Sequence, residues 1–476
     1  MTVKNINNYS FHNNKYIKQA YVNNDGYVGN CAFSGCDSIV GDVVVENNGY
    51  VGSSAFYDCD GIENVNISNN GYVGSSAFKN CANLVTADVH NKGYIGVSAF
   101  QDCTSLQNLV LGENVGALGA SAFKNCSSLQ ELAIPNNIPS MGSYCFSDCS
   151  SLRKVAVGTG IVQLSEGVFK NCISLIDMSI GVNVNSVMAK VFYNCSSLPA
   201  INIPQATKTI NDSVFYDCKK LALVVFENRA DSIVLGSNGK SPMFSRCSLD
   251  SVYVGGKLEY NKTEAKGYSP FYGNKYLKSV TFNDSEVAVY DKEFMGCSYL
   301  RNVTLGNGIK EIGAEAFCDC SALPLITIPN SVTTMGKFAF ARCYSLKKAL
   351  IGDGTDGVKE GAFMDCSSLV DIKLGASIGT IEKESFYNCS SLPEITIPQA
   401  TASIADGVFY GCKSLARFFV EDGSRTLSIG AGFISTGFGG EIVGGSAMFG
   451  TCSLDSVYLG RNLSYNQTEA YDYSPC

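Results

Sequence analysis

Cysteine is the reactive side chain that this 476-residue sequence uses most regularly. Of its 21 cysteines, 17 stand three residues after a phenylalanine, from Cys36 to Cys452, and asparagine takes this place as Asn14 and Asn274. The two residue types replace each other where a side chain hydrogen-bonds turn backbone. We therefore expect a buried, reduced ladder rather than disulfides. Core filling or chance explains the four cysteines outside the pattern, which are Cys31, Cys145, Cys318 and Cys476.

Other residue patterns that could support catalysis are missing from the sequence. The two histidines, His12 and His90, have no recognisable neighbours for a nucleophile–base pair. One cysteine per repeat lacks the clustering of zinc ligands, and the glycine–aspartate run at 352–357 lacks the full calcium-loop pattern. No phosphate loop or dinucleotide fingerprint occurs. The sequence therefore predicts a non-enzymatic protein with no catalytic residue, no metal and no cofactor.

Composition excludes further classes of function. Charged residues make up 16% of the chain, with a net charge of −8 and a pI near 5.0, which disfavours nucleic-acid binding and docking on anionic membranes. No apolar run reaches the ~18 residues of a membrane span. The first residues lack the apolar run of a signal peptide. This leaves three alternatives: a removed leader, another export route, or no export.

The spacing of the phenylalanines predicts how the cysteines are held. Successive phenylalanines are mostly 22 or 23 residues apart, and such a period is the signature of a solenoid. The alternation of Leu323, Ile326 and Ile328 before Pro329 predicts a short strand with alternate residues inward, ended by proline. A second edge then returns the chain and turns phenylalanine and cysteine into the core. We expect about 19 coils of 22–23 residues.

Residues 1–100 form a distinct group of repeats that carry Asn-Gly-Tyr or a close variant. Their tyrosines precede buried aliphatic positions, so they are expected to point outward and stack; they are Tyr27, Tyr50, Tyr72 and Tyr94. One interpretation is that this aromatic stripe only stabilises the coils. The other is that it is a recognition surface, because tyrosine suits interfaces.

Two regular stretches follow, and each ends in an irregular block. Residues 101–271 close with the block 215–271, and residues 272–476 close with the block 409–476. The blocks are copies, because Ser248–Val254 reads as Ser453–Leu459 does. We expect one continuous solenoid in which a group of coils has been duplicated, with end-to-end self-association as a possible consequence.

The irregular blocks are the predicted ligand-binding region. Outward positions there become larger and mostly apolar, and insertions on a solenoid commonly accompany a binding face. The candidates are Leu223, Val225, Tyr253, Tyr260, Tyr268, Arg417, Phe419, Tyr458, Tyr465 and Tyr471. The alternative is that the long loops fold over these residues and cover them.

The repeat resembles the BspA-like leucine-rich repeat family of bacterial and protist surface proteins. The resemblance rests on the spacing of Ile312-Gly313, Ala316-Phe317, Cys320, Leu323 and Ile326-x-Ile328-Pro329, and it covers nearly the whole chain. It implies a right-handed leucine-rich-repeat coil with a parallel β-sheet face.

The resemblance also implies a function in protein–protein interaction and adhesion. It suggests a cell-surface or secreted protein that binds a protein or glycan ligand on a host or microbial surface. Two alternatives stay open at this point. One is a structural virion or filament component, and the other is an intracellular scaffold in the cytoplasm; either could assemble end to end.

Overall fold

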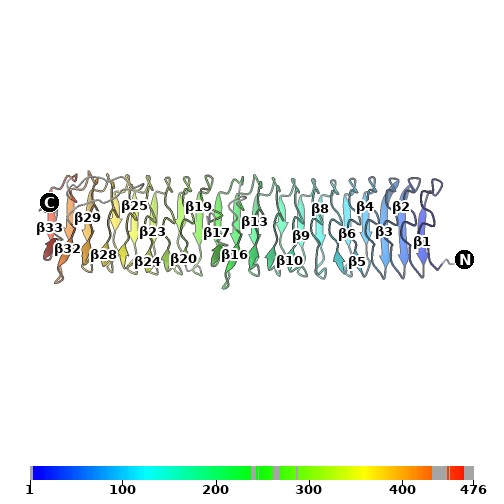
Figure 1. Ribbon diagram of the computed structural model, residues 1–476, viewed down its shortest axis with the longest axis horizontal. Helices are drawn as coiled ribbons and strands as arrows, with labels where there is room; N and C mark the ends of the chain where they lie inside the picture. The colour runs from blue at the N-terminus through cyan, green and yellow to red at the C-terminus, as the bar shows by residue number, and fades with distance from the viewer. Residues whose placement is uncertain are drawn as a thin grey trace. The chain divides into compact units, whose positions relative to one another are not determined.

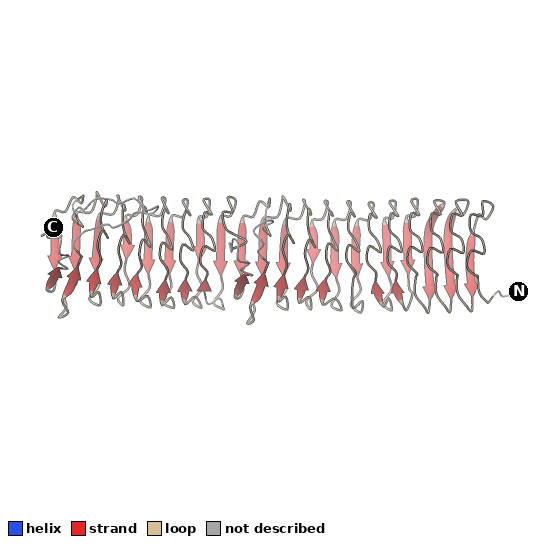
Figure 2. Ribbon diagram, viewed as in Figure 1, coloured by secondary structure: helices blue, strands red, loops and turns tan. Residues whose placement is uncertain are grey.

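The computed structural model describes residues 4–236, 243–244, 246–260, 269–285, 288–430, 448–449 and 451–465. Every regular element in these ranges is a β-strand, and the chain winds as a parallel β-solenoid of about 17 turns (Figures 1 and 2). The solenoid expected from the sequence is therefore confirmed, with a coil count close to the expected 19. The chain divides into two compact units: Met1–Glu227 with Ser232–Leu249 and Glu259–Gly267, and Asn228–Asp231 with Asp250–Leu258 and Tyr268–Cys476.

Each regular coil has a first edge and a second edge, which Figure 2 shows as longer and shorter strands. In one coil the first edge is β23 (Leu325–Ile328), where Ile326 and Ile328 are buried while Leu325 is exposed. The second edge is β24 (Thr334–Met335), which turns Met335 inward. This alternation follows from the two-residue period of a strand.

In the first unit, ten strands form the first edge. Six second-edge strands lie wholly within the same unit. The first edge holds β1 (Ala20–Asn24), β2 (Gly41–Asn47), β3 (Ile62–Asn69), β4 (Thr86–Val89), β6 (Asn108–Leu111), β8 (Glu131–Ile134), β9 (Lys154–Val157), β11 (Asp177–Ser179), β13 (Ala200–Ile203) and β15 (Leu223–Phe226). The second edge holds β5 (Tyr94–Ile95), β7 (Ala117–Leu118), β10 (Gln163–Leu164), β12 (Ser186–Val187), β14 (Thr209–Ile210) and β16 (Ile233–Leu235).

The second unit repeats this plan. Its first edge holds β17 (Ser251–Val254), β19 (Ser279–Phe282), β21 (Asn302–Thr304), β23, β25 (Lys348–Ile351), β27 (Asp371–Lys373), β29 (Glu394–Ile397), β31 (Arg417–Val420) and β33 (Ser456–Leu459). Its second edge holds β20 (Ala288–Val289), β22 (Glu311–Ile312), β24, β26 (Gly357–Val358), β28 (Thr380–Ile381), β30 (Ser403–Ile404), β32 (Leu427–Ile429) and β34 (Leu463–Tyr465). The boundary between the units falls within the second-edge strand β18 (Leu258–Tyr260).

Among the described strands, hydrogen-bonded pairing along the first edge is interrupted at four places. It stops between β6 and β8, between β11 and β13, between β21 and β23, and between β27 and β29. The strand after each of the last three interruptions is preceded by a proline, namely Pro199, Pro324 or Pro393. In the coil after the first of these, Ala222 N–H donates to Pro199 O at 2.9 Å. Proline has no N–H for the equivalent bond to the coil before it, which accounts for these three interruptions.

The turn between phenylalanine and cysteine explains why asparagine and aspartate recur there. The residue just before the cysteine has a positive φ, as in Asp148 (65°) and Asn171 (61°). Asparagine, aspartate and glycine adopt this left-handed conformation most readily. The side chains also bond from coil to coil, with Asn171 Nδ2 donating to Asp148 Oδ1 at 2.7 Å.

The core of each unit is a stack of phenylalanine rings with a parallel column of thiols. Phe56 and Phe78 stack at 5.0 Å in the first unit, and Phe317 and Phe340 at 5.3 Å in the second. Every described cysteine is free. Each of the 17 ladder thiols donates a hydrogen bond of 3.0–3.4 Å to the carbonyl of the phenylalanine one coil earlier. The reduced, backbone-bonded ladder is therefore confirmed.

The asparagines do not make the hydrogen bond that the ladder cysteines make. Asn14 Oδ1 accepts from the N–H groups of residues 16 and 17, at 2.9 and 3.2 Å. Asn274 Oδ1 likewise accepts from residues 276 and 277, at 2.9 and 3.1 Å. The amide thus closes its own turn as an acceptor, whereas the thiol joins two coils as a donor.

Candidate partner-binding surface

Strand β15 presents apolar side chains on the outer face of the first unit. Leu223 is 39% exposed and Val225 is half-buried, while Val224 between them lies in the core. The register with β13 sets Leu223 beside Ala200 and Val225 beside Asn202. The outward rows therefore change from a small and a polar residue to two larger apolar ones.

Tyr253 occupies an outward position on β17 in the second unit. Its ring is half-buried, and its hydroxyl donates to Asn228 Oδ1 at 2.8 Å. Asn283 Nδ2 donates to the same oxygen, also at 2.8 Å. Asn228, near the start of an inserted turn, thus holds the Tyr253 hydroxyl.

The second block gives Tyr458 the same kind of support. Its hydroxyl donates to Asp422 Oδ1 at 2.8 Å, and this bond raises the pKa of the Tyr458 phenol. Tyr458 is 51% exposed, and the register places Phe419 directly beside it on β31. These two side chains form an aromatic pair on the outer face of the second unit.

Arg417 lies on the neighbouring outward row and is already paired. Its Nε and Nη2 atoms donate to Glu394 Oε2 at 2.8 and 2.5 Å. Both side chains are about half exposed, so the pair contributes little to stability. Beside Phe419 and Tyr458, the Arg417 side chain is therefore held in one position and its charge is balanced by Glu394.

The two inserted turns begin with the same contacts. Glu227 Oε2 accepts from Gln205 N–H at 2.9 Å, and Glu421 Oε2 accepts from Gln399 N–H at 2.8 Å. The residue after each glutamate is the tyrosine's acceptor, Asn228 or Asp422. Comparison of the two blocks in the sequence would have identified these acceptors, because both copies keep a carboxylate followed by an aspartate or asparagine.

A buried arginine in each block was not anticipated from the sequence. Arg229 and Arg461 are only 4% and 7% exposed. Aligning the blocks sets Arg229 against Gly423, and Gly256 against Arg461. A Cβ on Gly256 would lie 2.2 Å from Arg229 Cγ, so there is no space for a side chain at position 256 while Arg229 is present. Each block therefore has one arginine and one glycine at these two positions, in opposite order.

The remaining block candidates lie elsewhere. Tyr260 is on β18 and Tyr465 on β34, which are second-edge strands, so neither shares an edge with Tyr253 or Tyr458. Tyr268 and Tyr471 fall outside the described residues.

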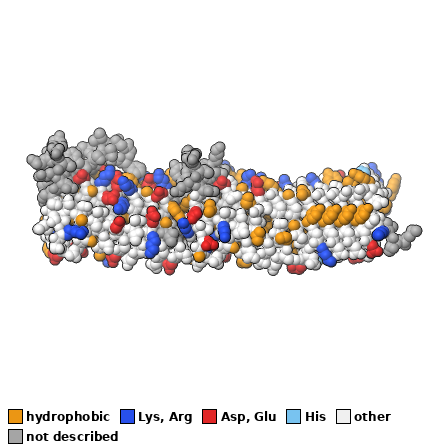
Figure 3. Space-filling view, turned by 60° about the horizontal axis from the view of Figure 1, so that its bottom comes forward, with side chains coloured by type: hydrophobic (Ala, Val, Ile, Leu, Met, Phe, Trp, Pro, Cys, Tyr) orange, Lys and Arg blue, Asp and Glu red, His pale blue; other side chains and the backbone are white. Residues whose placement is uncertain are grey.

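The four N-terminal tyrosines form an aligned stack. Ring centroids from Tyr27 to Tyr50, Tyr72 and Tyr94 are 5.0, 4.8 and 5.0 Å apart, with interplanar angles of 6° or less. The first three rings are half-buried, and Tyr94 is 49% exposed. Glycine before each ring permits the close approach of the coils, since a Cβ on Gly49 would lie 2.3 Å from a carbonyl oxygen. Figure 3 shows a continuous row of hydrophobic side chains on these coils.

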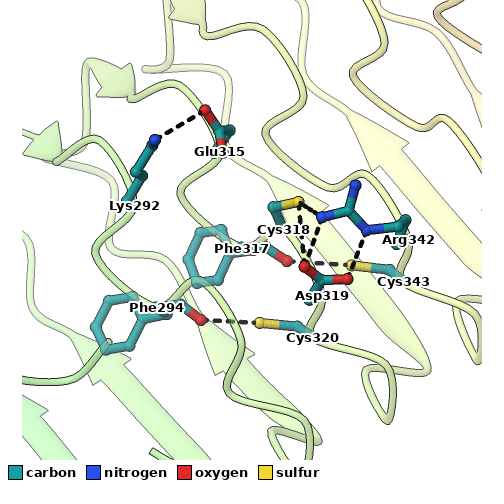
Figure 4. A network of polar contacts seen from close by, with 9 residues as sticks. All are labelled: Lys292, Phe294, Glu315, Phe317, Cys318, Asp319, Cys320, Arg342 and Cys343. Atoms are coloured by element: carbon teal, nitrogen blue, oxygen red, sulfur yellow. Dashed lines mark hydrogen bonds and ion pairs between the residues drawn. The ribbon is translucent and has the colours of Figure 1, made fainter. Parts of the chain in front are cut away.

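A network of polar contacts in the second unit surrounds Cys318 (Figure 4). Arg342 donates to both carboxylate oxygens of Asp319 at 2.6 Å and to Cys318 Sγ at 3.2 Å. Burial raises the pKa of Cys318 to about 12, so its thiol stays protonated and is a poor nucleophile. Cys318 packs with Ala341 and Met364, which confirms its expected role in filling the core.

Each of the two histidines lies beside a polar side chain. His90 Nε2 lies 2.7 Å from Asp88 Oδ1, and His12 Nε2 lies 3.1 Å from Asn13 Nδ2. In the described part of the chain, no group of three potential ligands could hold a metal ion. The same residues include no helix with the length and hydropathy of a membrane span.

The chain belongs to the BspA type Leucine rich repeat region family. The family pattern matches residues 4–130, 93–222, 159–269, 240–367 and 338–435. Proteins with these repeats are generally non-enzymatic, and the family indicates a role in protein interaction.

Solved structures of similar proteins include bacterial leucine-rich repeat proteins. One from Bacteroides ovatus is 19% identical, covers 89% of this chain and 88% of its own, and has a TM-score of 0.41. A leucine rich cell surface protein from Faecalibacterium prausnitzii is 20% identical, with 73% and 82% coverage and a TM-score of 0.29. A T. pallidum protein is 27% identical over 33% of this chain and 78% of its own, with a TM-score of 0.29. No curated protein matches the chain.

Proposed function

We propose that this chain is a non-enzymatic adhesion solenoid that binds a protein ligand through the outward faces of its irregular blocks. The observation that carries the proposal is the outward pair of Phe419, which is half-buried, and Tyr458, which is exposed and whose hydroxyl is held by Asp422. Aromatic side chains dominate binding energy at protein interfaces. A tyrosine that is already oriented loses less conformational entropy on binding.

The first block supports the same proposal. Tyr253 has an equivalent acceptor in Asn228, so the chain carries two copies of a held tyrosine. In the first unit, Leu223 and Val225 add apolar area to the outer face of β15. In regular coils the corresponding residues are mostly polar or small, for example Glu394 and Thr396 on β29.

A binding measurement with charge variants tests this function. Immobilised purified extracellular-matrix proteins serve as the panel, and the full chain is passed over them by surface plasmon resonance. We expect at least one to bind, and the double variant Tyr253→Glu, Tyr458→Glu to bind at least about tenfold more weakly. Tyr299→Glu is the matched control, because Tyr299 is 53% exposed outside the blocks. The proposal is rejected if no panel member binds or if the double variant binds as the wild type does.

A cell-surface or secreted location fits this function, and the family supports it through its surface proteins. The location is tested by labelling intact cells of the source organism with an antibody against the chain. Labelling of intact cells, or recovery of the chain from the culture medium, supports it. Signal only after permeabilisation contradicts it and favours the scaffold alternative.

Self-association is a second candidate function, because the coil around Phe11 carries a partly apolar groove that a second copy of the chain could occupy. Phe11 is 39% exposed, whereas the next stacked ring, Phe33, is 5% exposed. Phe11, Ile17 and Val22 line a groove of about 510 Å³ there. Light scattering over a concentration series tests this candidate, with Phe11→Asp expected to abolish any oligomer. A monomer at all concentrations excludes it.

A further inference from the structure

A polar groove of about 570 Å³ runs across the turns that follow the first-edge strands of the N-terminal coils. Every side chain that lines it is polar or charged, from Asn23 in the first strand to Asn114 four coils later. Four steps of about 4.8 Å give a length of about 19 Å. The groove therefore has the dimensions of an extended chain rather than of a compact metabolite.

One wall of the groove is a row of side chains with unused hydrogen-bonding capacity. Asn70 Nδ2 donates to Asn48 Oδ1 at 3.0 Å, and Asn48 Nδ2 donates to Asp25 Oδ1 at 3.4 Å. A carboxamide has two donors and two acceptor lone pairs, so each amide retains sites for a ligand after making these bonds. All three side chains are exposed.

Three asparagines beneath this wall are buried and incompletely bonded. Asn24, Asn47 and Asn69 are 8%, 6% and 4% exposed, and all three line the groove. The Oδ1 atoms of Asn24 and Asn47 and both amide atoms of Asn69 have no hydrogen-bond partner. Buried polar atoms are normally paired, and leaving them unpaired costs free energy. These atoms lie below the accessible surface, so they make the floor of the groove polar, and the exposed amides of the wall are the groups that bond a ligand rich in hydroxyl groups.

The charges of the groove exclude strongly ionic ligands. The carboxylates of Asp25 and Glu46 face only one lysine, Lys92. His90 is the remaining titratable group, and it lies against Asp88. A phosphate chain would meet repulsion from the two carboxylates, and a polycation would find only two acidic partners. A neutral ligand fits this balance.

The tyrosine stack follows the wall in each coil of the chain and adds a platform outside the residues that line the groove. Each ring follows two residues after a turn residue of the wall, as Tyr27 follows Asp25 and Tyr50 follows Asn48. The stack stops at Tyr94, because the next coil places Ala117 opposite it. The last ring is therefore open on one side, and such a face suits the apolar face of a sugar ring.

We infer that this groove binds a neutral, linear polysaccharide built of hexopyranose units. The amides bond the hydroxyl groups, the repeat of the coils matches a polymer, and Tyr94 stacks on a terminal ring. This site is separate from the irregular blocks, so the two binding activities can be lost independently.

Titration calorimetry with defined oligosaccharides tests the inference. The full chain is titrated with cellohexaose, maltohexaose, laminarihexaose and mannohexaose. Each is raised to about 10 mM, which detects a dissociation constant near 1 mM. We expect at least one to bind, and the double variant Asn48→Ala, Asn70→Ala to weaken binding at least tenfold. The matched control Asn307→Ala, an exposed turn residue of the second unit, should bind as the wild type does.

A second variant protects the test against a folding defect. Tyr94→Ser changes an exposed ring at the end of the stack and should also weaken binding. Circular dichroism and the thermal midpoint establish that each variant is folded. The inference is overturned if none of the four oligosaccharides binds, or if folded variants at Asn48, Asn70 and Tyr94 bind as tightly as the wild type.

Discussion

The hydroxyl of Tyr458 donates a 2.8 Å hydrogen bond to Asp422 Oδ1, and this contact joins the outer face of β33 to the start of an inserted turn. The bond and the negative charge both raise the pKa of the phenol, because they oppose its ionisation. We predict that Asp422→Ala lowers the pKa of Tyr458 toward its ordinary value. NMR titration of carbon-labelled tyrosine measures this directly.

The natural alternative at this position provides a control. Asn228 holds Tyr253 in the first block, so Asp422→Asn keeps an acceptor and removes only the charge. Its effect on the Tyr458 pKa should be smaller than that of Asp422→Ala. A Tyr458 pKa that is equal in wild type and both variants would show that the contact does not persist in solution.

The regular part of the fold could be predicted because it depends on local, repeated constraints. Burial of one phenylalanine and one cysteine every 22 or 23 residues fixes a coil, and the alternation at Ile326 and Ile328 fixes its strand. The difference between Asn14 and a ladder cysteine could not be predicted. Both side chains bond turn backbone, and only the coordinates distinguish an acceptor within one turn from a donor between two coils.

The outward placement of Leu223, Tyr253 and Tyr458 was also accessible, since it follows from strand alternation. Their partners were accessible only as candidates: the two blocks share a glutamate followed by Asn228 or Asp422, but the position of Asp422 relative to Tyr458 depends on the path of an inserted turn that the regular repeat does not set. Tyr465 illustrates the same limit. It follows Tyr458 closely in the sequence, yet it lies on a strand of the other edge.

The buried thiols predict a loss of stability in alkaline solution. Burial raises the pKa of Cys59, Cys149 and Cys297 from 9.0 to about 12. The unfolded chain therefore releases these protons at lower pH than the folded chain. Stability is fully present below pH 9 and falls as the pH rises from 9 toward 12, by about 1.4 kcal/mol per pH unit for each thiol. Urea unfolding at a series of pH values measures this slope, and a flat profile would contradict the ladder.

The thiol of Cys149 should stabilise the protein through its bond to Phe123 O, which is 3.3 Å long. Cys149→Ala removes one of the two donors to this buried carbonyl, which keeps the Cys126 N–H at 3.4 Å, and we expect a loss of about 0.5–1.5 kcal/mol. Cys149→Ser keeps a donor of similar size and should cost less. Denaturant unfolding compares the two, and Cys31→Ala, at a half-buried position outside the ladder, is the control. Equal losses for alanine and serine would assign the effect to packing alone.

The exchange of arginine and glycine between the blocks predicts a coupled pair of mutations. A Cβ on Gly256 would lie 2.2 Å from Arg229 Cγ, so Gly256→Ala should destabilise the protein by about 1–3 kcal/mol through overpacking. In the second block Gly423 stands where Arg229 does, and Arg461 fills the space by donating to Gln399 O and Pro398 O at 2.5 and 2.9 Å. Arg229→Gly should therefore remove the side-chain part of the clash with the added methyl group, which leaves the carbonyl oxygen of residue 229 at 2.9 Å.

A double-mutant cycle on these two positions decides whether the exchange is compensatory. The free energy of unfolding is measured for Gly256→Ala, Arg229→Gly and their combination. Because the two side chains compete for one space, the double variant should be more stable than the sum of the single losses, by at least about 0.5 kcal/mol. Gly352→Ala in a regular coil, where a Cβ would lie 2.6 Å from backbone atoms, serves as the uncoupled control with Arg229→Gly. Additive losses at positions 229 and 256 would show that the arginine does not occupy the space above the glycine.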